Sequence, residues 1–117
     1  MDHISALFPN IAQMWNPHVR FVQDLINSDV VVIFSKSQCP YCYMAKDVFR
    51  KLRQPYTAIE LDQRRDGEEI QEVLRKMTGA KSYVQVPRIF INGRFIGGAN
   101  DIKDLYETGK LRRILNK

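Results

Sequence analysis

The sequence has few cysteines, few histidines and no long apolar stretch. Among its 117 residues are two cysteines, two histidines and one tryptophan. Two cysteines are too few for a secreted disulfide scaffold, and no apolar run approaches the roughly 18 residues that mark a transmembrane helix. No Lys or Arg precedes Arg20, so the N-terminus lacks the basic pattern of a signal or transit peptide. These absences predict a protein of the reducing cytoplasm with no membrane partner.

Length and charge predict one small domain. With 44% hydrophobic residues, the chain can bury a single core without disulfides or metals. The net charge is +5, but the basic residues are spread along the chain, with small clusters at Arg64-Arg65 and Arg112-Arg113. Such spacing is typical of a solvated surface, so we predict no nucleic-acid partner. A modestly positive surface would also suit an anionic small substrate.

Strand and helix patterns alternate along the chain. Residues 1–16 are predicted to be an N-terminal extension with apolar residues at helical spacing, and residues 17–117 to be the domain. The alternation predicts an α/β fold, a mixed four-stranded sheet with helices on both faces. The expected elements are a helix from Pro17 that ends near Asn27-Ser28, strands over 30–35 and 56–62, a helix over about 41–53 between them, a helix that ends at Gly79, strands over 86–91 and 94–96 joined by Asn92-Gly93, and one last helix after Gly98.

The two cysteines stand together in Cys39-Pro40-Tyr41-Cys42, where a predicted strand passes into a predicted helix. Pro40 suits the first helical position, since its missing N–H costs nothing there. Unpaired N–H groups and the positive end of the helix dipole favour a thiolate on Cys39. With Lys36 nearby, such surroundings can lower a cysteine pKa from about 8.5 to roughly 3.5–7.5. We predict that Cys39 is the nucleophile and that Cys42, one turn later, is the resolving thiol.

Two other roles for the cysteine pair have less support. Structural zinc normally takes four protein ligands, and there is no second C-x-x-C motif. The two histidines, His3 and His18, lie upstream without ligand-like spacing. A structural disulfide between residues so close in sequence would remove little chain entropy. The pattern therefore predicts a redox pair and no metal, and C-x-x-C beside a β-α-β pattern points to a thioredoxin-like fold.

Three motifs in this order resemble the dithiol glutaredoxins. They are Lys36-Ser37-Gln38-Cys39-Pro40-Tyr41-Cys42, Val86-Pro87, and Gly97-Gly98 before a helix, and the resemblance spans about residues 18–115. It implies a thioredoxin-like fold and glutathione-dependent reduction of protein disulfides and glutathione mixed disulfides. The partners would be glutathione and glutathionylated or disulfide-containing proteins. We expect a monomer.

The resemblance also implies a glutathione site. Pro87 would be cis and face the cysteines, and the Val86 backbone would pair with the cysteinyl part of glutathione. N–H groups at the last helix's N-terminus can bind the γ-glutamyl carboxylate. Asn100 and Asp101 would lie at this end, as ligands or as helix caps. The full set implied for glutathione is Lys36, Cys39, Tyr41, Gln71, Val86, Pro87, Gly98, Ala99, Asn100 and Asp101.

At the other end of glutathione, Lys36 and Gln71 match the positions that hold the glycine carboxylate. The role of Gln71 rests on the resemblance. The chain departs from the family pattern at Ala99, where a cysteine is usual, and at Gln85, where threonine or serine is usual. It also has Ser82-Tyr83-Val84-Gln85 where one residue is usual. The extra residues lengthen the loop expected beside the glutathione site, and that loop would affect which protein substrates bind.

Two other functions use related motifs. A thioredoxin would usually carry Trp-Cys-Gly-Pro-Cys, and the single tryptophan, Trp15, lies far from the cysteines. Some glutaredoxins hold an iron–sulfur cluster between two subunits, with the first cysteine and glutathione as ligands. Pro40 resembles the members of the family that mostly do not hold such a cluster. A glutathione-ligated iron–sulfur binding module is therefore the alternative to the enzyme.

Overall fold

The computed structural model describes residues 16–80 and 85–117. The predicted helical pattern of the N-terminal extension and the residues Ser82-Tyr83-Val84 lie outside the described residues. Within the described part of the chain, no helix is long and apolar enough to cross a membrane.

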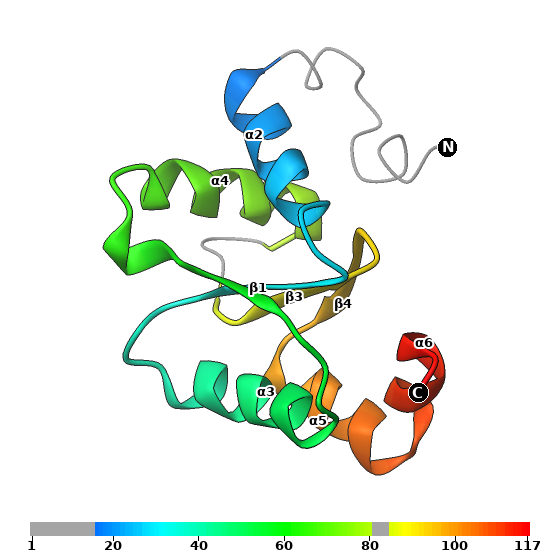
Figure 1. Ribbon diagram of the computed structural model, residues 1–117. Coiled ribbons are helices and arrows are strands. Elements are labelled where there is room, and N and C mark those ends of the chain that lie inside the picture. Colours follow the sequence, from blue (N-terminus) through cyan, green and yellow to red (C-terminus); the bar gives the residue numbers. More distant parts are fainter. Residues whose placement is uncertain (1–15, 81–84) are drawn as a thin grey trace.

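A mixed four-stranded sheet forms the middle layer (Figure 1). Its strands are β1 (Val31–Ser35), β2 (Thr57–Glu60), β3 (Arg88–Ile91) and β4 (Arg94–Gly97), in the order β2-β1-β3-β4. β1 is parallel to β2 and antiparallel to β3, which pairs antiparallel with β4. All five residues of β1 are buried, as expected for a β-branched run covered on both faces.

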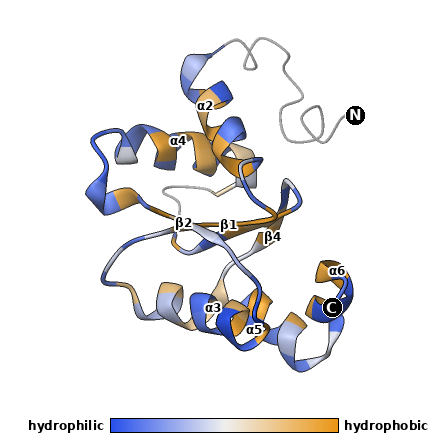
Figure 2. Ribbon diagram, viewed as in Figure 1, coloured by the Kyte–Doolittle hydropathy of each residue, from blue (hydrophilic) through white to orange (hydrophobic). Residues whose placement is uncertain are grey.

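Helices cover both faces of the sheet (Figure 1). α2 (Pro17–Ile26) and α4 (Gly67–Thr78) lie on one face, and α3 (Pro40–Lys51), α5 (Ala99–Glu107) and α6 (Lys110–Leu115) on the other. Because side chains alternate along a strand, Phe34 and Phe90 join the core under α2 and α4, and Ile33 and Ile89 join the core over α3 and α5. Apolar residues of the helices turn toward the sheet (Figure 2). The predicted fold class is confirmed.

Three predicted elements differ from the structure. The strand expected over 56–62 ends at Glu60, and the next turn is the 3-10 helix η2 (Leu61–Gln63), because Leu61 turns into the core. The strand expected over 86–91 begins only at Arg88, after a proline that has no N–H for a ladder. The single last helix is two helices, because Gly109 adopts a left-handed conformation with φ of 78° between α5 and α6.

Other local predictions are confirmed. Asn92 and Gly93 both have positive φ, 52° and 80°, as the tight hairpin between β3 and β4 requires. Gly79 is the left-handed C-cap of α4. Pro17 is the first residue of α2, and the side chain of Asn16 accepts the His18 N–H at 2.8 Å as its N-cap.

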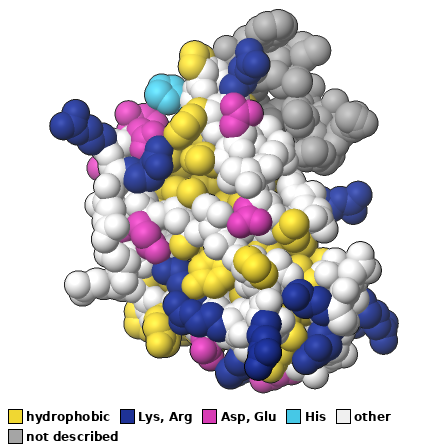
Figure 3. All heavy atoms as spheres, viewed as in Figure 1, with side chains coloured by type: hydrophobic (Ala, Val, Ile, Leu, Met, Phe, Trp, Pro, Cys, Tyr) yellow, Lys and Arg dark blue, Asp and Glu magenta, His cyan; other side chains and the backbone are white. Residues whose placement is uncertain are grey.

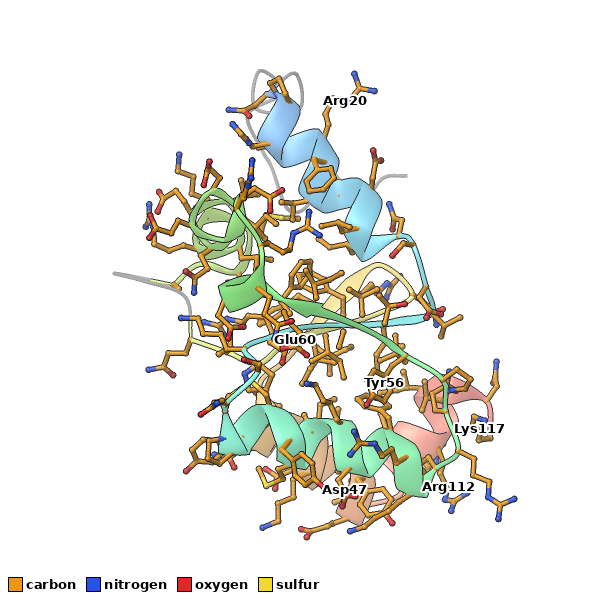
Figure 4. All side chains as sticks on the ribbon, turned by 60° about the vertical axis from the view of Figure 1, so that its left-hand side comes forward. Arg20, Asp47, Tyr56, Glu60, Arg112 and Lys117 are labelled. Atoms are coloured by element: carbon orange, nitrogen blue, oxygen red, sulfur yellow. A yellow bond between two sulfur atoms is a disulfide. The ribbon has the colours of Figure 1, made fainter. Side chains whose placement is uncertain are left out.

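Basic side chains are less evenly spread in space than along the sequence. On the face shown in Figure 3, most Lys and Arg side chains gather over the layer of α3, α5 and α6. The last turn of α3 carries Arg50 and Lys51, and α6 carries Arg112 and Arg113. Figure 4 shows Arg112 and Lys117 at this end of the domain, where Lys117 Nζ donates to the Arg53 carbonyl at 3.4 Å.

Candidate active site

The cysteine pair opens helix α3 as the sequence predicts. Cys39 is the N-cap residue in an extended conformation, and Pro40 is the first helical residue. The two cysteines form a disulfide, and the Cys42 N–H donates to Cys39 Sγ at 3.2 Å. Cys42 is only 1% exposed, whereas Cys39 is half-buried at the surface. A molecule arriving from solvent therefore meets Cys39 first.

The loop before Cys39 is anchored to η2. Asp62 accepts the Ser37 N–H at 3.0 Å and also the Ser37 hydroxyl. These hydrogen bonds to the ionised carboxylate hold the pKa of Asp62 below its usual value. The approach to the cysteines is thus fixed by a carboxylate that follows the neighbouring strand.

A partly buried ion pair ties α3 to the sheet. Lys46 Nζ lies 2.7 Å from Glu60 Oε2, and the two side chains are 14% and 23% exposed. The Ser35 hydroxyl donates to Glu60 Oε1 at 2.8 Å, so both carboxylate oxygens are used (Figure 4 labels Glu60 beside α3). Lys46 lies one turn after Cys42 on the same face of α3. The network joins the carboxyl ends of β1 and β2 to the helix that carries the cysteines.

A pocket on one side of Cys39 gathers most of the predicted glutathione residues. We call it the Val86 pocket. The Val86-Pro87 peptide bond is cis as predicted, and the Val86 carbonyl oxygen lies 3.9 Å from Cys39 Sγ. The lining residues are Tyr41, Gln85, Val86, Pro87, Arg88, Gly98, Ala99, Asn100 and Asp101.

Two adjacent glycines lead into α5, and the second of them, Gly98, lines the Val86 pocket. Gly97 has a φ of 142°, and a Cβ there would overlap the carboxylate of Asp101. Gly98 is the N-cap of α5, and its N–H donates to Asp101 Oδ2 at 2.9 Å. Asp101 therefore acts as a helix cap, which is one of its two predicted roles. Its cap bond occupies one carboxylate oxygen.

The sequence analysis did not single out Arg88, which lines the same pocket. The guanidinium carbon of Arg88 lies 5.4 Å from the centre of the Phe95 ring. Burial lowers the pKa of Arg88, and the nearby charge of Asp101 partly opposes this. Nε is buried and has no hydrogen-bond partner within the described residues. An arginine that opens an otherwise apolar strand, Arg88-Ile89-Phe90-Ile91, was the signal in the sequence.

A second pocket lies by α4, and both Lys36 and Gln71 line it. We call it the Lys36 pocket. Its lining residues are Lys36, Leu61, Asp62, Arg64, Arg65, Gly67, Glu68, Glu69 and Gln71. Lys36 forms no ion pair within residues 16–80 and 85–117, so its charge is not neutralised by a direct partner there. Its predicted effect on the Cys39 thiolate stays a prediction.

The rim of the Lys36 pocket is ordered by an arginine. Arg64 donates to both carboxylate oxygens of Asp66, at 2.8 Å and 3.0 Å, and its guanidinium carbon lies 5.4 Å from the centre of the Phe21 ring. The paired charges raise the pKa of Arg64 and lower that of Asp66. Arg64 is thus held at the rim, beside the exposed Arg65.

The Glutaredoxin family model matches residues 31–96, which run from β1 into β4 and include both cysteines and Val86-Pro87. The chain belongs to the glutaredoxin family. This glutaredoxin is therefore a glutathione-dependent thiol-disulfide oxidoreductase of thioredoxin-like fold, with Cys39 and Cys42 as its active-site pair.

Individual relatives agree with this assignment. Glutaredoxin-C4 of Arabidopsis thaliana is 47% identical over 100 residues, which are 86% of this chain and 72% of the relative. Mitochondrial glutaredoxin-2 of Mus musculus is 46% identical over 99 residues, 85% of this chain and 62% of the relative. The crystal structure of a buckwheat glutaredoxin–glutathione complex has a TM-score of 0.79 and 39% identity, and the match covers 85% of this chain and 87% of that one.

Proposed function

We propose that this glutaredoxin reduces glutathione mixed disulfides and protein disulfides with Cys39 as the attacking sulfur and Cys42 as the resolving one. The supporting observation is the difference in exposure within the pair, since Cys42 is 1% exposed and Cys39 lies at the surface. In the reduced protein, the N-terminus of α3 and the Cys42 N–H favour a negative charge on Cys39. We therefore expect a Cys39 thiolate at neutral pH.

The reaction consists of successive thiol-disulfide exchanges. The Cys39 thiolate attacks the glutathionyl sulfur of the substrate, a new S–S bond forms, and the substrate sulfur leaves as a thiolate that takes up a proton. A second glutathione thiolate then attacks the glutathionyl sulfur on Cys39, which releases the Cys39 thiolate and glutathione disulfide. With a protein disulfide, Cys42 attacks the mixed disulfide at Cys39 and forms the Cys39–Cys42 disulfide, which two glutathione molecules reduce.

We propose that glutathione lies across both pockets with its sulfur at Cys39. The cysteinyl part would pair with the Val86 backbone, as an added strand does, between Tyr41 and Pro87. The γ-glutamyl end would occupy the Val86 pocket beside Ala99, Asn100 and Asp101, and the glycine carboxylate the Lys36 pocket. The buckwheat relative's complex with glutathione supports this choice of ligand.

The test compares two cysteine variants and two substrates. With a glutathione mixed disulfide, Cys39→Ser should lose turnover down to the uncatalysed rate, whereas Cys42→Ser should retain it, because glutathione itself resolves the intermediate. With a protein disulfide, both variants should fail. Equal losses on the mixed disulfide would contradict the assigned roles. Glutathione with glutathione reductase should support turnover, and thioredoxin reductase in its place should not.

We also propose that the site holds no metal. Within the described residues, no group of three or more Cys, His, Asp or Glu side chains is placed to bind a metal ion. This observation concerns a site built from side chains alone. The iron–sulfur alternative would use the first cysteine and glutathione from two subunits, so it is tested by anaerobic purification of the reduced protein with glutathione. A colourless protein is expected, and visible absorption with stoichiometric iron would contradict the proposal.

A monomer in the cytosol is the remaining part of the proposal. The support is the composition and the mixed surface charge. The name of the mouse relative, mitochondrial glutaredoxin-2, makes the mitochondrion the location to test against. Light scattering of the purified chain should give the mass of one copy, and a tagged chain should appear in the cytosolic fraction. A dimer mass, or recovery with mitochondria, would contradict these two points.

A further inference from the structure

Arg88 carries a charge that the protein does not fully satisfy. Its Nε is buried and lacks a hydrogen-bond partner within the described residues. Buried polar groups in folded proteins are nearly always paired, so each exception needs an explanation. The guanidinium lies over the Phe95 ring on the neighbouring strand, which fixes its plane but supplies no acceptor.

Arg88 and Asp101 place opposite charges in one hollow without a direct contact. Both line the Val86 pocket, and no ion pair within 4.0 Å joins them among the described residues. Asp101 instead accepts the Gly98 N–H with one carboxylate oxygen. The pocket therefore presents a fixed cation and a fixed anion side by side.

This pair of charges fits a ligand end that carries both an ammonium and a carboxylate. Glutathione has one such end, the γ-glutamyl group, with its α-ammonium and α-carboxylate. The glycine end has a carboxylate only. The Lys36 pocket is lined by three basic side chains, Lys36, Arg64 and Arg65, and also by the carboxylates of Asp62, Glu68 and Glu69. Arg64 is already paired with Asp66, which leaves Lys36 and Arg65 for the single carboxylate of the glycine end.

We propose that Arg88 is a specificity-determining residue whose guanidinium joins the N–H groups at the start of α5 in binding the α-carboxylate of the γ-glutamyl group, while the Asp101 carboxylate would take the ammonium. This inference rests on the proposed placement of glutathione. A planar guanidinium suits a carboxylate because it can donate two parallel hydrogen bonds. Because Nε itself is buried, the carboxylate would accept from the terminal nitrogens of the guanidinium.

The experiment pairs an Arg88 variant with a substrate that lacks the carboxylate. Two mixed disulfides with the same leaving thiol are compared: one of glutathione, and one of γ-aminobutyryl-cysteinyl-glycine, in which hydrogen replaces the α-carboxylate. For the unchanged protein, we expect kcat/KM to favour the glutathione substrate by about tenfold or more. In Arg88→Gln, kcat/KM should fall by a similar factor for the glutathione substrate and little for the analogue.

Two further variants separate recognition from structure. Arg94→Gln removes an exposed arginine from the neighbouring strand β4 and should leave the preference unchanged. Arg88→Lys keeps the charge but loses the paired donors, so its preference should be intermediate, and it replaces Arg88→Gln if that variant does not fold. An equal loss on both substrates in the Arg88 variants would assign the residue to packing on Phe95 and overturn the inference.

The outcomes also distinguish this inference from the proposed function. If the unchanged protein reduces glutathione mixed disulfides through Cys39 but shows no preference between the two substrates, only the inference about Arg88 fails. If Cys39→Ser retains turnover, the proposed mechanism fails whatever the preference. If both the Gln and Lys variants keep the full preference, the carboxylate binds elsewhere.

Discussion

The Val86 pocket and the Lys36 pocket are built in different ways. The Val86 pocket is formed by a cis proline, a glycine turn and the first turn of α5, with the partly buried Arg88 in its wall. The Lys36 pocket is formed by charged side chains of η2, the loop after it and the start of α4, most of them exposed. The first pocket depends on backbone geometry, which solvent does not screen. The second depends on charges that salt and water weaken.

This difference predicts unequal sensitivity to substitution. A change of backbone shape should damage the Val86 pocket strongly and locally, whereas the Lys36 pocket should tolerate the loss of single side chains. The glycine end of glutathione would then contribute attraction, and the γ-glutamyl end selectivity.

Gly97→Ala should have the largest effect. The position has a φ of 142°, and the added Cβ would overlap the Asp101 carboxylate, so the free energy of unfolding should fall by about 3 kcal/mol. Because Asp101 would be displaced, the KM for a glutathione mixed disulfide should rise as well. Urea denaturation and steady-state kinetics measure the two effects.

The matched control for this prediction is Gly109→Ala. Gly109 also has a positive φ, 78°, but a Cβ there has no heavy atom within 4 Å. Gly109→Ala should lower the free energy of unfolding by about 1–2 kcal/mol, which is the cost of a left-handed residue alone. It should leave the KM for the mixed disulfide unchanged. If the two variants behave alike, the glycine turn does not shape the Val86 pocket.

Asp101 should show two separable roles. Asp101→Ala removes both the charge and the acceptor for the Gly98 N–H, so we expect a loss of about 1 kcal/mol in unfolding free energy and a rise in KM of about tenfold. Asp101→Asn keeps an acceptor oxygen and should raise KM similarly at nearly unchanged stability. An unchanged KM in Asp101→Asn would make the carboxylate a cap only. The rate of Cys39 alkylation should be unaffected in both variants.

Lys36→Gln should have a smaller effect that depends on salt. An exposed ion pair is worth up to about 1 kcal/mol, so KM should rise by about two- to fivefold at low salt and by less at high salt. The control is Lys103→Gln, which removes an exposed lysine of α5. It should change KM neither at low salt nor at high salt. A salt-independent rise in KM would show that Lys36 acts through geometry instead of charge.

The same variant tests the second predicted role of Lys36. The pH dependence of iodoacetamide alkylation reports the Cys39 thiolate. In Lys36→Gln, the helix N-terminus and the Cys42 N–H remain in place. The pH midpoint of Cys39 alkylation should therefore rise by less than about one pH unit. A larger rise would show that Lys36 is the main source of thiolate stabilisation. Its principal role would then be to act on Cys39, not to bind the glycine carboxylate of glutathione.

The sequence predicted the features that depend on neighbouring residues. The position of Cys39 at a helix start, the hairpin at Asn92-Gly93 and the cap at Gly79 follow from short patterns. It did not predict the break at Gly109, although a glycine within a helical pattern was visible, because apolar residues continued at helical spacing on both sides. That break depends on how α6 folds back to bury Leu111.

The candidate site was predictable to a different extent. The residues of the Val86 pocket came mainly from the family resemblance, since their contacts join segments far apart in the sequence. Arg88 was missed because its guanidinium lies over Phe95 of the adjacent strand and near the charge of Asp101 in α5, and both neighbours are brought to it only by the fold. A sequence reading treats a charged residue at a strand end as exposed, and only the folded chain shows otherwise.

The smallest expected effect concerns the acid stability of the loop beside the Lys36 pocket. The hydrogen bonds from Ser37 lower the pKa of Asp62 in the folded state. Their contribution to stability is therefore present above the unfolded Asp value of about 3.9 and is lost as the pH falls through the lower folded value. The urea midpoint of the unchanged protein should fall more steeply from pH 5 to pH 3 than that of Asp62→Asn, whose side chain does not ionise. Asp66 and Glu72, whose pKa values are lowered by arginine partners, add an acid-dependent loss that both proteins share. The control is Asp24→Asn, at an exposed position of α2. Its urea midpoint should fall with pH as steeply as that of the unchanged protein. If the midpoints of all three proteins fall equally steeply, Asp62 does not stabilise the loop through its charge.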